Sequence, residues 1–315
     1  MAFSFLLITA CYSPFTQNTD ISTRKLTTSS ECRVIQHKLG ETCIPVKPQR
    51  IITLEVSWIL DPLLALGIKP VGTVSFYGGG RGYFPGLSTE EVAGIEIVGT
   101  PTGPNIEKIL KLKPDLILSL DSGNNIYQQL SSIAPTVVRA YDNIKLSFKE
   151  NFRAIAQLLG ESEKAEKVLT QYKKRIETLQ KLLGNRREEI EISVITYYTG
   201  SFSIPASYAP FFQVFNDIGL RLKPVFIKQN EYVPFSIEAI NEYDADILFI
   251  VNFDNKPSSY FFQNPLISSL KAAKNKRAYI VKADTWWSYG PLGMNKLLDE
   301  LPQYLLESMN MKHAS

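Results

Sequence analysis

The chain has 315 residues, 44% of them hydrophobic, and its 34 basic and 31 acidic side chains give a net charge of +3. This length and composition predict roughly two globular domains with apolar cores and exclude a disordered chain. The small net charge, with no dense basic block, argues against nucleic acid as a partner.

The N-terminus carries a short apolar run, residues 2–10, in which small residues lead directly to Cys11. This arrangement is typical of a bacterial lipoprotein signal peptide, so we expect cleavage before Cys11 and acylation of its thiol. The protein would then work outside the cytoplasm, in the periplasm or on the outer face of the cytoplasmic membrane, and touch the membrane through its lipid anchor only. The alternative is a buried strand with a core cysteine. Residues 12–31, rich in Ser, Thr, Asn and Gln, are typical of a flexible tether.

Three cysteines are present, and an odd number in an exported chain needs an explanation. If Cys11 is acylated, Cys32 and Cys43 remain as a pair in an oxidising compartment, on either side of a polar, hairpin-like segment. We expect a disulfide between them. The alternative is two free, buried thiols.

From residue 51 onward, short apolar runs alternate with helical patterns. The expected strands are residues 51–54, 70–74, 95–99, 116–120 and 137–138, and the expected helices are residues 59–67, 106–112 and 127–133. Ser88 and Glu91 have the spacing of a capping box, and Asn105 precedes a helix as its N-cap. Strands that alternate with helices predict a parallel, doubly wound sheet.

Residues 147–184 show sustained helical periodicity, interrupted only at Gly160, which predicts one long, stiff helix. A second α/β pattern follows it. Its expected strands are residues 192–197, 247–251 and 278–281, and its expected helices are residues 211–218, 237–242, 266–273 and 292–306. The expected fold class is therefore α/β, with two doubly wound lobes joined by one long rigid helix and a ligand cleft between them.

The expected divisions of the chain are 1–31 for the lipoprotein signal and tether, 32–146 for the N-terminal lobe, 147–184 for the linker helix and 185–315 for the C-terminal lobe. Ligands of such sheets bind outside the carboxyl ends of the strands. Loops at residues 55–58, 76–84, 121–125, 198–208 and 284–289 should therefore face the cleft.

The sequence contains no recognisable catalytic constellation. Its histidines are His37, inside the expected disulfide loop, and His313, close to the C-terminus. Neither is placed for a Ser-His-Asp or Cys-His arrangement, and a metal site built from protein ligands would be short of imidazole. The glycine-rich run at residues 78–82 lacks the spacing of a phosphate-binding loop. A two-lobed α/β enzyme is an alternative that only the fold supports.

Several segments together carry a family resemblance. They are PQRIITLE at residues 48–55, LLALGIKPVG at 63–72, PNIEKILKLKPDLIL at 104–118, IAPT at 133–136, SIEAI at 236–240, DADILFI at 244–250 and WSYG at 287–290. In this order they resemble the substrate-binding proteins of ABC importers for iron-siderophores and cobalamin. The resemblance implies a two-lobed monomer that is not an enzyme, has no intrinsic cofactor and hands a metal chelate to a permease. The expected ligand is a ferric siderophore of hydroxamate or citrate-hydroxamate type, with a cobalamin or haem binder as the alternative.

The resemblance also implies roles for single residues. Glu107 and Glu238 match two family glutamates that pair with arginines of the permease dimer; without the resemblance each is an ordinary solvated helix residue. Trp287 matches a position that packs on the chelate, and at least one of Trp286 and Trp287 should face the cleft, although such a pair is more often found in a core. Arg81 is expected to contact the chelate in place of an arginine that this chain lacks at residues 100–102. The other candidate ligand contacts are Trp58, Tyr77, Tyr83, Tyr198, Tyr208, Tyr232 and Tyr289.

Overall fold

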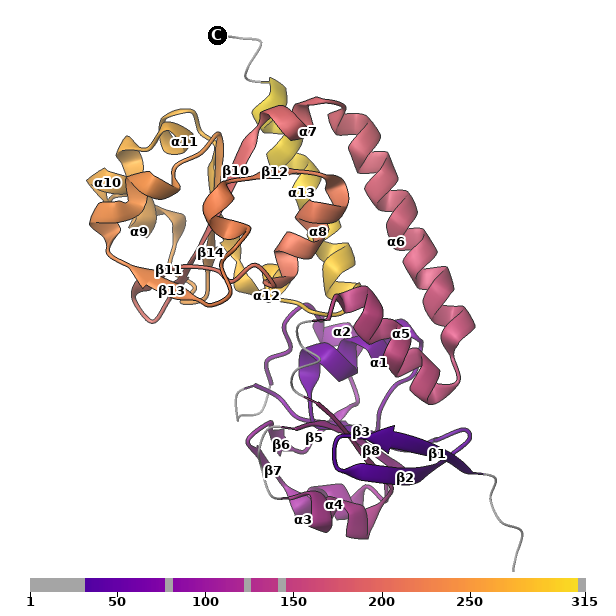
Figure 1. The fold of residues 1–315 in the computed structure, drawn as a ribbon. Coiled ribbons are helices and arrows are strands. Elements are labelled where there is room, and N and C mark those ends of the chain that lie inside the picture. Colours follow the sequence, from indigo (N-terminus) through magenta and orange to yellow (C-terminus); the bar gives the residue numbers. More distant parts are fainter. Residues whose placement is uncertain (1–31, 77–81, 122–125, 141–145, 311–315) are drawn as a thin grey trace, which may run out of the picture. The chain divides into compact units, whose positions relative to one another are not determined.

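The computed structural model describes residues 32–76, 82–121, 126–140 and 146–310 (Figure 1). Cys11 with its tether, Tyr77 and Arg81 lie outside the described residues. From Cys32 onward the chain forms one compact unit that contains two large sheets. In the described part of the chain, no helix combines the length and the apolar character needed to cross a membrane.

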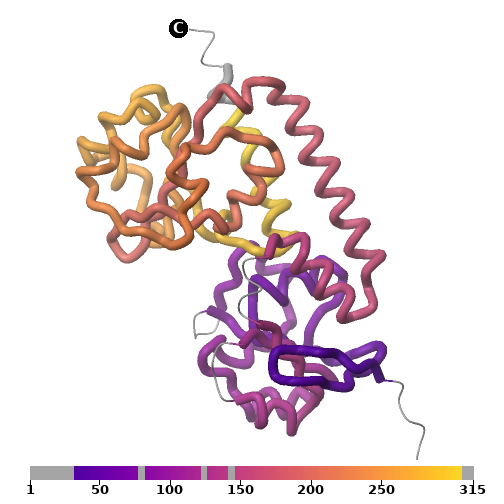
Figure 2. The backbone as a smooth tube through the Cα atoms, in the orientation of Figure 1, coloured from indigo at the N-terminus to yellow at the C-terminus, as the bar shows by residue number. Residues whose placement is uncertain are grey.

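The described chain begins with an antiparallel hairpin of β1 (Cys32–His37) and β2 (Gly40–Pro45), which is drawn in indigo in Figure 2. A disulfide joins Cys32 to Cys43, with 5.6 Å between their Cα atoms, so the expected pairing is confirmed. The two cysteines are 11 residues apart in sequence. On chain-entropy grounds, so short a loop limits the stabilisation to about 3 kcal/mol or less.

The first large sheet is parallel and doubly wound, as the sequence predicts. Its strands are β3 (Ile51–Thr53), β4 (Gly72–Thr73), β5 (Glu96–Ile97), β8 (Leu116–Leu120) and β9 (Thr136–Arg139). Their order is β5-β4-β3-β8-β9, and every neighbouring pair is parallel. The chain winds outward from β3 through β4 and β5, and then outward on the other side through β8 and β9. The switch point therefore lies between β3 and β8.

Successive strand residues point to opposite faces of this sheet, and both faces are buried at its central strands β3 and β8. Ile51, Leu116 and Leu118 belong to the large core that also contains the buried side chains of the linker helices and of the second sheet. Ile52 and Ile117 belong to a separate cluster. The continuous apolar runs of these strands are what a sheet covered on both faces requires.

Short helices and one small ribbon complete this part of the chain. They are the π-helical turn η1 (Val56–Leu60), α1 (Asp61–Ala65), α2 (Thr89–Val92), α3 (Ile106–Lys111), α4 (Tyr127–Ile133) and the two-stranded ribbon β6 (Gly99–Thr100) and β7 (Gly103–Pro104). The capping box of Ser88 and Glu91 is present at α2. The Asn105 side chain accepts a hydrogen bond from the Lys108 N–H at 2.9 Å, which confirms it as the N-cap of α3.

The linker is not one helix, and this corrects the sequence prediction. α5 (Phe148–Leu159) ends at Gly160, where φ is +76°, and α6 (Ser162–Leu183) begins two residues later. Glycine adopts this left-handed conformation without strain, so the chain turns where the periodicity alone suggests a tolerated interruption. Figure 2 shows the chain reversing direction between the two helices. α6 has 22 residues and spans about 33 Å.

The second large sheet is mixed. Its strands are β10 (Glu191–Tyr198), β11 (Ser201–Ile204), β12 (Arg221–Leu222), β13 (Val233–Phe235), β14 (Ile247–Asn252) and β15 (Ala278–Lys282). Along one edge of β10, β14 and then β15 continue the parallel pattern. Along its other edge, the start of β10 pairs parallel with β12, and its end pairs antiparallel with β11, which in turn pairs antiparallel with β13. The expectation of a second doubly wound parallel sheet is correct for the central strands and wrong for β11 and β13.

Helices surround the second sheet. They are α7 (Arg186–Glu189), α8 (Pro210–Ile218), η3 (Pro224–Phe226), η4 (Ile237–Tyr243), α9 (Ser258–Phe262), α10 (Pro265–Ser269), α11 (Lys271–Lys274), α12 (Ala283–Trp286) and α13 (Pro291–Asn310). η3 and η4 are 3₁₀-helices. The exact lobe boundaries, 32–146 and 185–315, stay a prediction.

Candidate functional site

A cavity of about 760 Å³ is lined by residues that lie in or near strands of both sheets. The described lining residues are Phe76, Tyr83, Pro85, Thr196, Tyr198, Ser203, Tyr232, Phe253, Asn255, Asp284 and Trp287. Pockets for small organic ligands have this size and this mixture of aromatic walls and few polar groups. The first three residues come from the N-terminal lobe and the others from the C-terminal lobe, so a ligand here would contact both.

Trp287 is at the centre of the aromatic wall. Its ring centroid lies 5.0 Å from that of Phe253 in an edge-to-face arrangement and 5.4 Å from that of Tyr232. Burial raises the pKa of the Tyr232 hydroxyl, with smaller contributions from the neighbouring Tyr289 and Tyr208. These contacts fix the position of the indole, and its partial exposure leaves apolar surface for a ligand.

The turn between β10 and β11 positions Tyr198 beside Phe253, with ring centroids 5.6 Å apart. Thr199 and Gly200 both have positive φ, 48° and 80°, as a two-residue hairpin turn of type I′ requires. The Asp254 carboxylate accepts hydrogen bonds from both of their N–H groups at 2.9 Å. The turn therefore ties the loop after β14 to the loop after β10, and both loops supply cavity residues.

Asp284 is the one charged side chain among the described lining residues. The backbone at this position also joins the lobes, because the Gly86 N–H donates to the Asp284 carbonyl at 2.6 Å. A carboxylate at the wall repels a strongly anionic ligand and tolerates a neutral or weakly charged one.

The structure places four of the predicted ligand contacts, Tyr83, Tyr198, Tyr232 and Trp287, at the cavity wall. Tyr77 and Arg81 lie outside the described residues. Glu107 and Glu238 are exposed in the first turns of α3 and η4.

Three other candidates, Trp58, Trp286 and Tyr289, are corrected, because they are buried behind the wall. The fourth, Tyr208, is partly exposed and stays a prediction, although it is not among the described lining residues. Trp286 is fully buried against Phe211, Phe215 and Phe249, and its indole N–H donates to Glu300 at 3.1 Å. The rings of Trp58 and Tyr289 pack 4.5 Å apart and are almost completely buried. Tyr208 packs edge-to-face against Tyr232 at 6.3 Å.

Sequence reasoning missed Phe253 and Asn255, which follow β14. A signal was available, since residues 247–251 are predicted as a parallel strand and the residues after such a strand face the ligand side. Thr196 and Ser203 were not named as ligand contacts, although Ser203 lies in the segment 198–208 that was expected to face the cleft. Their hydroxyls lie 2.7 Å apart across the pair of β10 and β11, and β11 forms where the sequence predicts a loop.

Next to the loop that carries Trp287, a buried carboxylate of one lobe accepts hydrogen bonds from the other lobe. The fully buried Asp61, on α1, accepts hydrogen bonds from the N–H groups of Leu292 (2.9 Å) and Gly293 (3.0 Å) at the start of α13. The Ser288 hydroxyl donates to the same carboxylate at 3.4 Å. A Cβ added at Gly290 would lie only 2.0 Å from the Asp61 carboxyl carbon, so this approach is possible only for glycine. The carboxylate thus joins α1 to the loop that carries Trp287.

We expect stability to depend on the protonation of Asp61. Burial raises its pKa to about 7 from 3.8, although the Leu292 and Gly293 N–H groups oppose the shift. A raised pKa means that between pH 4 and 7 the folded state holds a proton that the unfolded state has lost, so the free energy of unfolding falls as pH rises through this window. One such proton changes the free energy of unfolding by at most about 1.4 kcal/mol per pH unit.

Urea unfolding of the wild type and of Asp61→Asn at pH 5, 6, 7 and 8 checks this prediction. In the Asp61→Asn variant, the free energy of unfolding should fall less steeply with pH, up to about pH 7, than in the wild type. Glu55→Gln is the matched comparison, because burial also raises the pKa of Glu55 to about 7 while its carboxylate caps η1 within the N-terminal lobe. If the free energy of unfolding depends on pH equally steeply in the wild type and in Asp61→Asn, the prediction is wrong.

Comparison with known proteins identifies relatives of the chain. Residues 87–285 match the family model described as periplasmic binding protein. The probable siderophore-binding lipoprotein YfiY of Bacillus subtilis is 31% identical, and the match covers 98% of both chains. The Fe(3+)-citrate-binding protein YfmC of the same organism is also 31% identical, over 89% of this chain and 87% of that protein.

Solved structures agree. Staphylococcus aureus SirA complexed with staphyloferrin B has a TM-score of 0.71 and 28% identity, and the match covers 87% of this chain and 98% of that one. A periplasmic solute binding protein from Mycobacterium smegmatis shares the fold, with a TM-score of 0.71 at 22% identity. Family members bind substrates and are not enzymes, which excludes the enzyme alternative. The chain belongs to the periplasmic binding protein family, with an α/β fold that builds its candidate binding cavity from both lobes.

Proposed function

We propose that this protein captures a ferric siderophore in the cavity around Trp287 and delivers it to the permease dimer of an ABC importer. The observation that carries the proposal is an aromatic cavity of about 760 Å³ lined by both lobes. The names of the relatives support it, since they include a binder of Fe(3+)-citrate and a complex with staphyloferrin B. Iron is cargo in this proposal. The chelator supplies the ligands of the metal, and the protein supplies aromatic surface and a few polar contacts.

Within this class we favour a hydroxamate or citrate-hydroxamate chelate. The carboxylate of Asp284 at the described wall disfavours a chelate with high negative charge. Arg81 and Tyr77 are proposed to complete the contacts, with the guanidinium facing chelate oxygens. Ferric hydroxamates carry little net charge, so they suit this wall best, whereas the citrate carboxylates of a citrate-hydroxamate chelate add negative charge that Arg81 would have to offset.

Intrinsic tryptophan fluorescence tests the proposal. The three tryptophans are Trp58, Trp286 and Trp287, and only Trp287 lies at the cavity wall. Titration with ferric hydroxamate and ferric citrate-hydroxamate siderophores should quench the emission, and the iron-free chelators should do so weakly. Cobalamin and haem belong in the same panel. Trp287→Phe should lose most of the quenching. Saturable binding of cobalamin or haem, without binding of any ferric siderophore, would overturn the proposal.

We further propose that the mature protein begins at an acylated Cys11 and acts as a monomer on the extracytoplasmic side of the membrane. The relative YfiY is described as a lipoprotein, and two or three acyl chains hold a protein stably on a bilayer. Mass spectrometry of the N-terminal peptide from native membranes should find diacylglycerol on the cysteine. Cys11→Ala should release the protein into the soluble fraction. Wild-type protein that is soluble and unmodified would contradict this prediction.

A further inference from the structure

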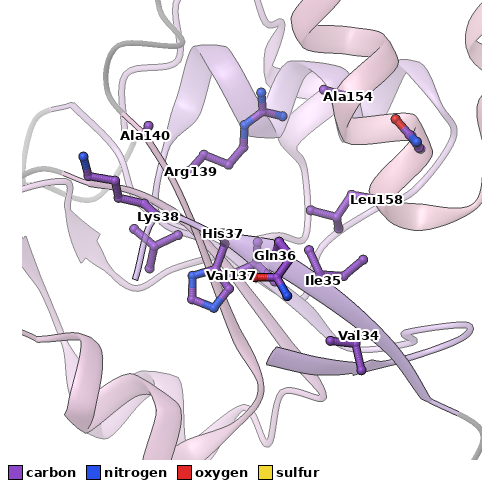
Figure 3. Close-up of a pocket in the computed structure, with 12 residues that line it drawn as sticks. Val34, Ile35, Gln36, His37, Lys38, Val137, Arg139, Ala140, Ala154 and Leu158 are labelled. Atoms are coloured by element: carbon purple, nitrogen blue, oxygen red, sulfur yellow. The ribbon is translucent and has the colours of Figure 1, made fainter. Parts of the chain in front are cut away.

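A second cavity, of about 410 Å³, lies between the N-terminal hairpin, β9 and α5 (Figure 3). Its walls are mostly apolar and include Val137, Val138, Ala154 and Leu158. Its residues differ from those of the cavity around Trp287, so the two cavities are separate. The charged side chains among its described lining residues are both basic, Lys38 and Arg139.

Arg139, the last residue of β9, is the principal basic group. Figure 3 shows its side chain extending toward Ala154 on α5. Burial lowers the pKa of its guanidinium, and within the described part of the chain no hydrogen bond or ion pair reaches this group. An arginine side chain has five N–H donors in a rigid planar fork. A partly buried fork without a protein partner is costly, and a bound anion would offset that cost.

The neighbouring groups keep this cavity positive. Lys38 lines it from the hairpin, and none of the described lining residues is acidic. His37 contributes no charge near neutral pH. Its Nδ1 accepts from the Leu39 N–H at 3.3 Å, its Nε2 lies 2.8 Å from the Thr42 hydroxyl, and burial lowers its pKa.

We propose that this cavity binds a small organic anion, a carboxylate on a short apolar body, with the carboxylate on the guanidinium of Arg139. One planar guanidinium matches the two oxygens of a carboxylate, whereas a phosphate dianion is usually held by several donors or a set of backbone N–H groups. The apolar walls favour a ligand that buries a short hydrocarbon part. The site is independent of the proposed siderophore cavity, because the two share no lining residue.

Hexanoate is the probe, with hexanol as its neutral counterpart and inorganic phosphate as the second anion. Binding is followed on the purified protein by ¹H–¹⁵N chemical-shift titration. Hexanoate should shift the amides around Arg139 and Ala154 with a dissociation constant in the millimolar range, and hexanol and phosphate should bind at least about tenfold more weakly. Equal binding of hexanol, or tighter binding of phosphate, would overturn the carboxylate assignment.

Three variants complete the experiment. Arg139→Met should weaken hexanoate binding about tenfold or more and should raise the melting temperature of the ligand-free protein by about 2 °C, because it removes an unpaired, partly buried charge. Arg139→Lys should keep part of the affinity. Lys69→Met, at an exposed lysine elsewhere in the same lobe, should bind like wild type. Unchanged hexanoate binding in Arg139→Met would overturn the proposal, as would a parallel loss of ferric siderophore binding, which would assign Arg139 to the main cavity.

Discussion

Replacing Trp287 by alanine is expected to weaken ferric siderophore binding about 30-fold or more, equivalent to about 2 kcal/mol, while the fold persists. The indole packs against Tyr232 and Phe253 and is partly exposed at the cavity wall. Its removal is therefore expected to cost contact area with the ligand together with some packing against the core. Isothermal titration calorimetry is the suitable measurement, since the variant also loses the tryptophan that reports on the cavity.

Trp286→Ala is the matched control. This neighbouring ring is fully buried and its N–H donates to Glu300, so its removal should lower the free energy of unfolding by about 3 to 5 kcal/mol. The protein that remains folded should bind the chelate with nearly normal affinity. If Trp287→Ala keeps wild-type affinity, or if both variants lose stability and affinity alike, Trp287 does not form the ligand wall.

Trp286 is buried and Trp287 lines the cavity, and the sequence alone could not predict which of these neighbours would be which. α12 ends at Trp286 and Trp287 follows as its C-cap. Successive helical residues differ by about 100° in direction, so one ring enters the core and the next faces the cavity. Two neighbouring apolar residues after a strand predict that one is buried. Which one it is depends on where a four-residue helix begins, and the sequence does not fix that point.

The central strands of the first sheet, β3 and β8, were predictable because each is a short, buried, β-branched or leucine-rich run, and alternation with helices fixes a parallel order. β11 and β13 were not, because β11 has only four residues, Ser201–Ile204, too few for its alternation of polar and apolar residues to stand out, and β13 has three residues with Pro234 at its centre. The role of Asp61 was also out of reach. Its partners, Leu292 and Gly293, are 231 and 232 residues away in sequence. No local sequence pattern predicts a contact over such a separation.

Glu107→Ala and Glu238→Ala should each reduce uptake into cells or permease-loaded vesicles, and the double variant should reduce it at least about tenfold, while chelate binding stays unchanged. A tenfold effect needs only about 1.4 kcal/mol, which is modest for a carboxylate that pairs with an arginine at an interface. Both side chains are exposed and neither lines the cavity. The Ser236 hydroxyl donates to the Glu238 carboxylate and lowers its pKa, so this group stays ionised over the physiological range.

Glu242→Ala is the control for Glu238, because it removes an exposed carboxylate from the same 3₁₀-helix. Residues four apart in such a helix point about 120° away from each other, so this variant should transport normally.

Glu107 and Glu238 can bind the same permease dimer only if the distance and orientation between the two lobes stay nearly constant. A single unbroken linker helix does not provide this rigidity, since α5 and α6 are separate. The hydrogen bonds from the start of α13 to Asp61 are a direct connection between the lobes, so Asp61→Ala should reduce uptake even where both glutamates are present.

Salt provides the decisive comparison. If the glutamates act through ion pairs with the permease, raising the ionic strength should depress wild-type uptake more than uptake by the double variant, because screening weakens interactions that the variant no longer has. If instead Glu107→Ala and Glu238→Ala lose chelate affinity in proportion to uptake, the carboxylates act on the ligand or the fold, and the docking assignment is wrong.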